Sequence, residues 1–449
     1  MPRNYRLNCR LIIVFIFLAL LVVGCSTYIP KSKIVPQEEL AKYNPKDFAN
    51  KKRFVNKDLA DEDEWIIKAI FYEQKNDFKK SNFYYKKLYN ATQKDEYLLK
   101  ELKTALYSGK KSENIAKLKE YVSTHPENLV AKRILLSSYL YEKKYEDAKK
   151  VSKLLLNQSD EAIDFELSAN PYIFTKDYSS AVSLLTQAYN KSYNENILLK
   201  ITTILVNYMG NISDAILRLE NHRKSQSCSE KVCLQLINIY FQQNRISSII
   251  PLYKSLYRST QKEIYAEKVV ESYIYLKDYD SAINYLKTDY KNVELLYSLY
   301  VDQKKYHIAD KLSQKLIAEN KDPKWYAESA MALYESSDNK DDKGMLAEVV
   351  KRFEIALKKG VENSVYLNYY GYTLIDKDID VKKGMKIIEK VLEEQPENSY
   401  YLDSLAWGYY KLGNCNKALK IMKKVVDIEG LKEDEIRNHW NLISQKCKK

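Results

Sequence analysis

A short phrase recurs along this chain at a nearly constant interval. The stretch SYLYEKKYEDA, residues 138–148, returns as SYIYLKDYDSA at residues 272–282, with its aromatic and small positions kept and its charges changed. The residue that ends the phrase, here called the anchor, has counterparts at Ser81, Asn114, Ala148, Ala181, Ala215, Ile249, Ala282, Ala309, Val349, Gly384 and Ala418. The early anchors follow one another at intervals of about 34 residues, which predicts an array of structural repeats.

Each unit carries the hydrophobic pattern of two amphipathic helices, each of about 12 to 14 residues, joined by a tight turn. In one unit, Leu135 and Tyr139 lie on one apolar stripe, and Ala148 and Leu155 lie on the other. The anchor is small because two antiparallel helices cross most closely there. An aromatic residue three places earlier is predicted to fill the end of the hairpin; it is found at Phe78, Tyr145, Tyr178, Tyr279 and Tyr306. The 10 glycines and 9 prolines among 449 residues leave little material for turns, which also favours helices over an all-β fold.

The last complete unit, YLDSLAWGYYKLGNCNKALKIMKKVV, resembles the tetratricopeptide repeat. The residues at the signature positions of that family are Leu405, Ala406, Tyr409, Gly413 and Ala418. Earlier units match more loosely, with Lys or Asn where the family has Gly before the turn. The resemblance implies an all-α fold, an α-solenoid of about 11 helical hairpins over residues 61–432.

Two irregularities interrupt the array. The interval from Ala282 to Ala309 is shorter than the others, and the next interval, to Val349, is longer and contains the polar insertion ESSDNKDDKG. A short unit followed by a loop predicts a kink or a boundary between blocks near residues 285–345. Residues 433–449 form one more amphipathic pattern without a partner, which predicts a C-terminal capping helix.

Residues 1–24 are predicted to be a lipoprotein signal peptide. A cationic start is followed by an apolar run at residues 11–23, which is short for a bilayer span but sufficient for a signal-peptide core. The sequence Val22-Val23-Gly24-Cys25 resembles the bacterial lipobox, which implies that Cys25 is lipidated and becomes the new N-terminus. A short transmembrane anchor with an incidental Cys is the alternative.

The residue after the lipobox Cys bears on the destination. Ser26 stands where Asp would signal retention at the inner membrane, so the resemblance implies the outer membrane, with the protein facing the periplasm. Residues 25–60 contain three prolines among charged residues and are predicted to be a lipidated tether.

Four cysteines remain after Cys9 and Cys25 are set aside. Cys228 and Cys233 flank a corner between repeats, and Cys415 and Cys447 are predicted to lie at one level of neighbouring helix layers. An even number in an oxidising compartment predicts the two disulfides Cys228–Cys233 and Cys415–Cys447. The first pair lacks the spacing of a redox-active Cys-x-x-Cys motif, which favours a structural role over redox catalysis.

No catalytic motif is present. The four histidines (His125, His222, His307 and His439) are not paired at metal-ligand spacing, and the sequence contains no HExxH, GxSxG, GxGxxG or GxxxxGK[ST]. The net charge of +13 is spread along the chain rather than gathered in a basic stripe. We therefore expect no enzyme activity, cofactor, metal, small-molecule substrate or nucleic acid.

Tyrosine is unusually abundant, with 40 Tyr against 11 Phe. In the tetratricopeptide family the first helix of each hairpin lines a concave groove, and aromatic rings there make good contact surfaces for proteins. The predicted partner-binding column consists of Tyr107, Tyr141, Phe174, Tyr208 and Tyr275, with Gln242 in the same series. In the last two repeats the corresponding positions are read as Asn368, Tyr372, Tyr400, Asp403, Trp407 and Tyr410. Alternatively, these rings only seal each helix against its neighbour.

The function predicted from these features is that of a non-catalytic periplasmic scaffold or adaptor lipoprotein. Its partners would be periplasmic or outer-membrane proteins of an envelope machine: a pilus, a flagellar motor, a secretion system or outer-membrane assembly. The alternative is an accessory that localises peptidoglycan or its processing enzymes. The fold alone does not decide between them.

Overall fold

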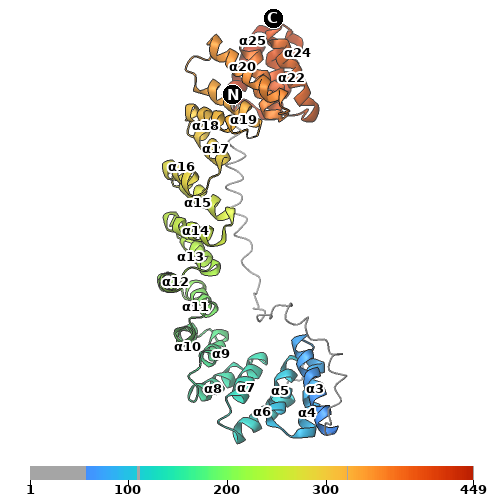
Figure 1. Cartoon of the computed structure of the whole chain (residues 1–449), viewed down its shortest axis with the longest axis vertical. Helices are drawn as coiled ribbons and strands as arrows, with labels where there is room; N and C mark the ends of the chain where they lie inside the picture. Colours follow the sequence, from blue (N-terminus) through green and yellow to red (C-terminus); the bar gives the residue numbers. More distant parts are fainter. Residues whose placement is uncertain (1–56, 109–111, 321, 448–449) are drawn as a thin grey trace. The chain divides into compact units, whose positions relative to one another are not determined.

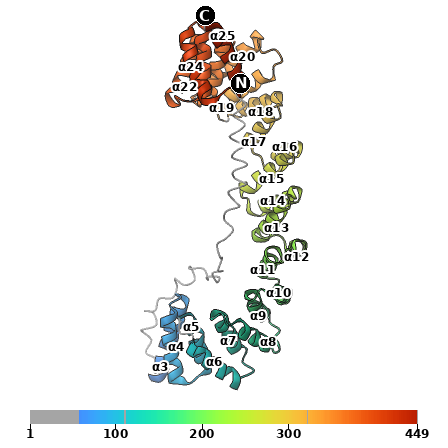
Figure 2. The same cartoon turned by 180° about the vertical axis from the view of Figure 1, so that it is seen from behind.

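The fold is known from a computed structural model, which describes residues 57–108, 112–320 and 322–447. Cys25, the predicted signal peptide and most of the predicted tether lie outside these residues. Within them every regular element is an α-helix, and the 23 helices form 11 consecutive hairpins followed by one final helix (Figures 1 and 2). We call the two helices of each hairpin A and B. The predicted all-α solenoid of about 11 tetratricopeptide-like hairpins is confirmed.

The chain divides into two compact units, and the division falls inside one helix, between Lys268 and Val269. The helices of the N-terminal unit are α3 (Lys57–Gln74), α4 (Phe78–Thr92), α5 (Asp95–Ser108), α6 (Ser112–Thr124), α7 (Leu129–Tyr141), α8 (Tyr145–Leu156), α9 (Ala162–Phe174), α10 (Tyr178–Ser192), α11 (Glu195–Asn207), α12 (Ile212–Gln226), α13 (Glu230–Gln242) and α14 (Ile246–Thr260).

The C-terminal unit begins within α15 (Glu263–Tyr275). Its other helices are α16 (Tyr279–Thr288), α17 (Val293–Asp302), α18 (Tyr306–Ala318), α19 (Lys324–Ser336), α20 (Lys343–Lys358), α21 (Ser364–Asp376), α22 (Val381–Glu394), α23 (Ser399–Lys411), α24 (Cys415–Glu429) and α25 (Asp434–Cys447). The division precedes the predicted boundary at residues 285–345, and a kink in that region stays a prediction.

The repeated phrase is the turn between helices A and B. Lys176 and Lys277 adopt φ of 62° and 59°, the left-handed conformation that ends an A helix and that Gly fills most easily. The next residue, Asp177 or Asp278, caps the B helix by accepting a hydrogen bond from the backbone N–H of the residue three places on. Lys and Asn therefore occupy the turn positions at which the family has Gly, at the cost of some backbone strain.

The anchors lie where helices A and B cross. Ala148, Ala181, Ala215 and Ala282 are completely buried, as the pattern predicted. The crossing at Gly384 is so close that an added Cβ atom would come within 2.5 Å of the carbonyl oxygen of Gly371. A residue without a side chain is needed at that anchor because the two backbones almost touch.

Tyrosine hydroxyls join successive A helices. In the N-terminal unit Tyr97 of α5 donates to Glu62 of α3 at 2.6 Å. In the C-terminal unit two tyrosines of α21 donate to α19, Tyr366 to Glu328 at 2.6 Å and Tyr369 to Glu335 at 3.0 Å. A Tyr in such a position fills apolar space and also satisfies a polar group, which Phe cannot do. This use accounts for part of the excess of Tyr.

The final helix, α25, packs on the last hairpin. Its Ile436 and Ile443 are buried in the same apolar cluster as Met422 and Val425 of α24. Such a helix covers the apolar face that the last repeat would otherwise expose, as the predicted capping helix should.

Candidate partner-binding site

Four aromatic side chains recur at the ends of the A helices in the N-terminal unit. Tyr141 and Phe174 are the last residues of α7 and α9, Tyr107 is one residue from the end of α5, and Tyr208 caps α11. We call these four residues the aromatic edge. Each lies seven residues before its anchor, so the edge gains one ring per hairpin. Their exposed fractions are 51 % for Tyr107, 49 % for Tyr141, 57 % for Phe174 and 58 % for Tyr208.

Three of these rings pack on the preceding hairpin. Tyr107 packs against Phe78, Phe174 against Tyr145, and Tyr208 against Tyr178, with ring centroids 4.9, 5.1 and 4.9 Å apart. In every case the partner is the first residue of a B helix, the ring that the sequence analysis placed at the end of the hairpin. One side of each of these three rings therefore seals a junction between repeats, while about half of the ring's surface remains open to solvent. At these positions a ring can therefore seal its helix against the neighbouring helix and still expose surface to a partner.

Tyr275 occupies the same position in the hairpin that opens the C-terminal unit. It is the last residue of α15, lies seven residues before Ala282, and has 63 % of its surface exposed. Its neighbour Leu276 is also exposed. Together they make a small apolar surface at the A–B turn of their own unit.

The residues predicted from the last two repeats behave differently. Trp407 and Asp403 have exposed fractions of only 7 % and 5 %. The Trp407 indole N–H donates to Asp376 at 3.2 Å, and the indole stacks on the imidazole of His439 in α25 at 4.2 Å between ring centroids. The expectation that these two side chains form an open contact surface is not met, because they are packed against the capping helix.

His439 is at the centre of this packed group. Its Nδ1 lies 2.9 Å from a carboxylate oxygen of Asp403, and its Nε2 lies 3.4 Å from the hydroxyl of Tyr372. We call Tyr372, Asp403, Trp407 and His439 the C-terminal cluster. The sequence analysis assigned no role to His439, because its partners are 36 and 67 residues away and no motif joins them.

The protonation of the C-terminal cluster is set by its burial. Burial raises the pKa of Asp403, and the hydrogen bond from His439 acts in the opposite direction. Burial, together with the charge of Glu435, raises the pKa of Tyr372 far above its ordinary value, so this phenol stays neutral. Asp403 therefore depends on His439 to carry a charge at this depth.

The other predicted groove residues of these repeats are partly covered. The Tyr410 ring stacks on Trp407 with centroids 4.9 Å apart, and the Tyr400 hydroxyl lies 3.5 Å from a carboxylate oxygen of Glu429. Asn368 is buried, and its side-chain oxygen has no hydrogen-bond partner among the described residues. Tyr400 and Tyr410 keep part of their surface and stay candidates for contact with a partner.

The structure brings both predicted cysteine pairs together. Cys228 and Cys233 are bonded across the start of α13, with Cα atoms 5.5 Å apart. Cys415, the first residue of α24, is bonded to Cys447, the last residue of α25, with Cα atoms 5.0 Å apart. The second bond ties the capping helix to the last hairpin. The oxidation state of these cysteines in the cell stays a prediction.

The described residues form no centre for metal chemistry. In the part of the chain that the structure covers, no three His, Cys, Asp or Glu side chains gather in a way that could hold a metal ion. Among the same residues, none of the helices combines the length and apolar character that a membrane crossing requires. The geometry instead offers protein surface: rings at helix ends, repeated hairpin by hairpin.

Comparison with known proteins supports the repeat fold and gives no function for this chain. No protein-family model matches this chain. A segment of 103 residues, or 23 % of this chain, is 26 % identical to a protein of Pseudomonas aeruginosa described as TPR repeat-containing. The chain spans only 18 % of the length of that relative.

Solved structures similar to this chain include two described as tetratricopeptide repeat proteins. One is a thermophilic protein from Thermus thermophilus, with 14 % identity and a TM-score of 0.33 over 40 % of this chain and 99 % of the other. Another comes from Parabacteroides merdae, with 14 % identity and a TM-score of 0.28 over 63 % of this chain and 98 % of the other. At these levels the likeness carries no conclusion about what the chain binds.

Proposed function

We propose that this chain is a non-catalytic scaffold that binds protein partners, with the aromatic edge as its main contact surface. The observation that carries the proposal is the recurrence of half-exposed rings at one position in successive hairpins. Aromatic side chains supply large contact areas at low entropic cost and are enriched among the residues that dominate binding energy. Packing on the preceding hairpin holds three of these rings in place before a partner arrives, which lowers the cost of ordering them.

The test is partner capture by the intact protein. Crosslinking in the cell, followed by purification, should recover partners with the native chain. The variant Tyr107→Ser/Tyr141→Ser/Phe174→Ser/Tyr208→Ser should lose them while keeping its helix content. Leu154 and Leu217 are exposed to 52 % and 57 % on B helices of the same unit, so Leu154→Ser/Leu217→Ser is the matched control. Equal recovery with the edge variant would place the binding surface elsewhere.

We further propose that the scaffold is attached to the outer membrane through lipid on Cys25 and faces the periplasm. The support is the lipobox-like sequence, with Ser26 after it. Several acyl chains on one residue give lasting attachment where a single chain is marginal. Cys25→Ala should leave an unprocessed precursor or release the chain, as fractionation would show. A processed variant that still cofractionates with the outer membrane would contradict attachment through Cys25.

The identity of the captured proteins decides between the two roles. Components of a pilus, flagellar motor, secretion system or outer-membrane assembly machine would support the envelope scaffold. Recovery of enzymes that process peptidoglycan would instead support the accessory role. An enzymatic function has no support in the described residues.

A further inference from the structure

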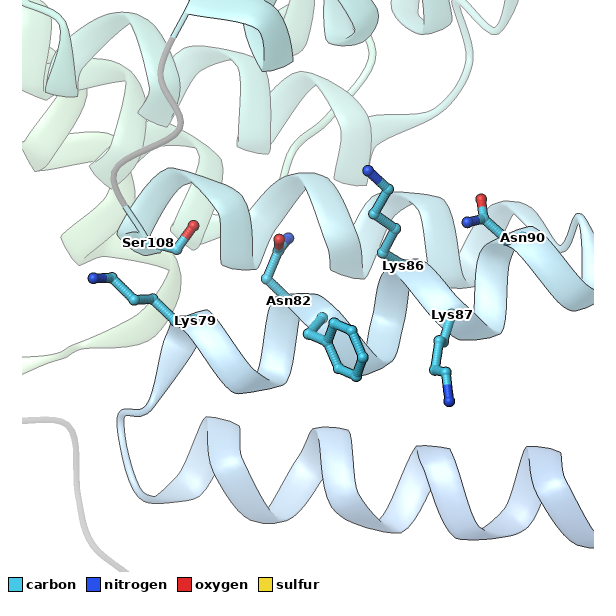
Figure 3. A pocket seen from close by; sticks show the side chains of 7 residues that line it. Lys79, Asn82, Lys86, Lys87, Asn90 and Ser108 are labelled. Atoms are coloured by element: carbon cyan, nitrogen blue, oxygen red, sulfur yellow. The ribbon is translucent and has the colours of Figure 1, made fainter.

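The first described hairpin has an open cavity along α4, beside the end of α5. Its volume is about 560 Å³. The cavity is lined by Lys79, Asn82, Phe83, Lys86, Lys87, Asn90 and Ser108. Figure 3 shows that the labelled α4 side chains come from one length of that helix, while Ser108 belongs to the end of α5. None of the seven is acidic.

The lysines of this cavity are not paired with carboxylates. Helix α4 contains no Asp or Glu, and within the described residues Lys79 and Lys86 form no ion pair. The Lys87 ammonium lies 4.5 Å from the ring centre of Trp65 and 5.7 Å from that of Phe83. Hydrogen bonds of Lys68 and Lys80 lower the pKa of Glu64 and of the N-cap Asp77, and the charges of Lys87 and Lys79 add to these two effects without forming ion pairs. Three cationic groups, none of them in an ion pair within the described residues, favour an anionic ligand.

The equivalent face of another B helix is balanced. On α8, Lys149 pairs with Glu146 at 2.9 Å and Lys150 with Asp147 at 3.1 Å. The unpaired lysines of α4 are therefore not shared by every B helix.

The same hairpin also exposes apolar side chains. Phe83 lies in the cavity lining with 56 % of its surface exposed. On α3, Ile67, Ile70 and Phe71 are exposed as well, but they lie on the face of that helix opposite to Ala69, which packs on α4. Lysines beside an exposed aromatic ring, here Phe83, are a composition found on surfaces that enter the headgroup region of a membrane.

We propose that the α4 cavity is a contact site for anionic lipid headgroups, with its three lysines on the lipid phosphates and Phe83 in the interfacial layer. A lysine ammonium is a compact positive charge that binds phosphate well. This hairpin is the first described part of the chain after Cys25, and the segment between them reaches about 110 Å at most. Lipid on Cys25, if attached as proposed above, would raise the local concentration of headgroups at this hairpin.

The test does not require the lipid on Cys25. The chain from residue 26 onward contains every described residue and carries no acyl group. We expect it to bind vesicles of equal parts phosphatidylglycerol and phosphatidylcholine, more weakly as salt is raised. Each lysine near an anionic surface contributes roughly fivefold to partitioning. Lys79→Gln/Lys86→Gln/Lys87→Gln should therefore lower it about a hundredfold, and Phe83→Ser about tenfold.

The matched control is Lys149→Gln/Lys150→Gln/Lys153→Gln on α8, which removes the same charge and should leave partitioning nearly unchanged. Equal binding to pure phosphatidylcholine, or an equal loss in the control, would overturn the site. Binding of soluble glycerol phosphate without binding of vesicles would assign the cavity to a free anion and overturn the membrane contact. Unchanged helix content in each variant excludes misfolding as the cause. Loss of partners by the aromatic-edge variant tests a different surface and leaves this result independent.

Discussion

The aromatic edge and the C-terminal cluster use aromatic side chains of A helices in opposite ways. Phe174 and Tyr208 expose more than half of their surfaces and stack on one ring of the preceding hairpin. Trp407 is covered, donates its N–H to Asp376 and stacks on His439 of α25. The same kind of helix thus carries exposed rings in one unit and a packed ring in the other.

The difference comes from position within the A helix. Each edge residue lies seven residues before its anchor, at the end of the helix. The edge position in the last repeat is Lys411, which pairs with Asp378 at 2.7 Å. Trp407 lies about one helical turn before Lys411. A ring at the helix end meets the turn and solvent, while a ring one turn earlier faces the next layer, here the capping helix.

The largest expected difference between the two regions is in stability. Trp407→Ala should lower the free energy of unfolding by about 3–5 kcal/mol, because it leaves a cavity beside α25 and removes the hydrogen bond to Asp376. Phe174→Ala should cost about 1 kcal/mol or less, since its ring is half exposed. Urea unfolding of both variants measures the two losses. Equal losses would mean that the two regions do not differ as described.

A pH titration sharpens the account of the C-terminal cluster. His439→Ala should cost about 3 kcal/mol near neutral pH, because it leaves the buried Asp403 carboxylate without its partner. The folded-state pKa of Asp403 is raised, so the neutral acid is the form that folding favours, and losing His439 raises that pKa further. The loss should therefore grow as pH rises through this pKa and shrink as pH falls below it.

Asp403→Asn/His439→Ala is the control for that titration. Without the carboxylate, the extra dependence on pH should disappear. A His439→Ala loss that is the same at every pH would show that His439 only fills space.

The two disulfides should differ less in how much each contributes to the free energy of unfolding. Cys415→Ser/Cys447→Ser should lower the free energy of unfolding by about 2–4 kcal/mol, chiefly by freeing a 32-residue loop of the unfolded chain. Cys228→Ser/Cys233→Ser should cost less, because its separation is only five residues. Non-reducing peptide mapping must first find both bonds in protein from the cell. Hydrogen exchange should then show α25 opening first in the Cys415/Cys447 variant, and protection of α25 equal to the native chain would contradict its tie to the last hairpin.

The hairpins could be predicted from the sequence because the repeat period reports shape directly. Small anchors such as Ala148 and Ala282 mark the helix crossings, and Lys or Asn in the turn could be recognised as a substitute for Gly. The capping helix followed from an amphipathic pattern without a partner. Each of these features depends on residues close in sequence or on a constant interval.

The contacts of individual rings could not be predicted in the same way. The stacking of Tyr145 on Phe174 joins two different hairpins, and the meeting of Trp407 with His439 depends on how α25 lies against α23. The sequence analysis also compared rings from different turns of the A helix, so that Trp407 was grouped with residues such as Tyr208. The number of residues between each ring and its anchor separates the two groups: seven for Tyr208 and eleven for Trp407.

The central claim is that partners contact the aromatic edge, and site-specific photocrosslinking tests it most directly. A photoreactive phenylalanine would replace Phe174 on the edge in one chain and Leu154, similarly exposed on α8, in another. The account predicts crosslinked partner from position 174 and little or none from position 154, with both chains folded. Equal crosslinking from the two positions, or crosslinking from position 154 alone, would contradict it.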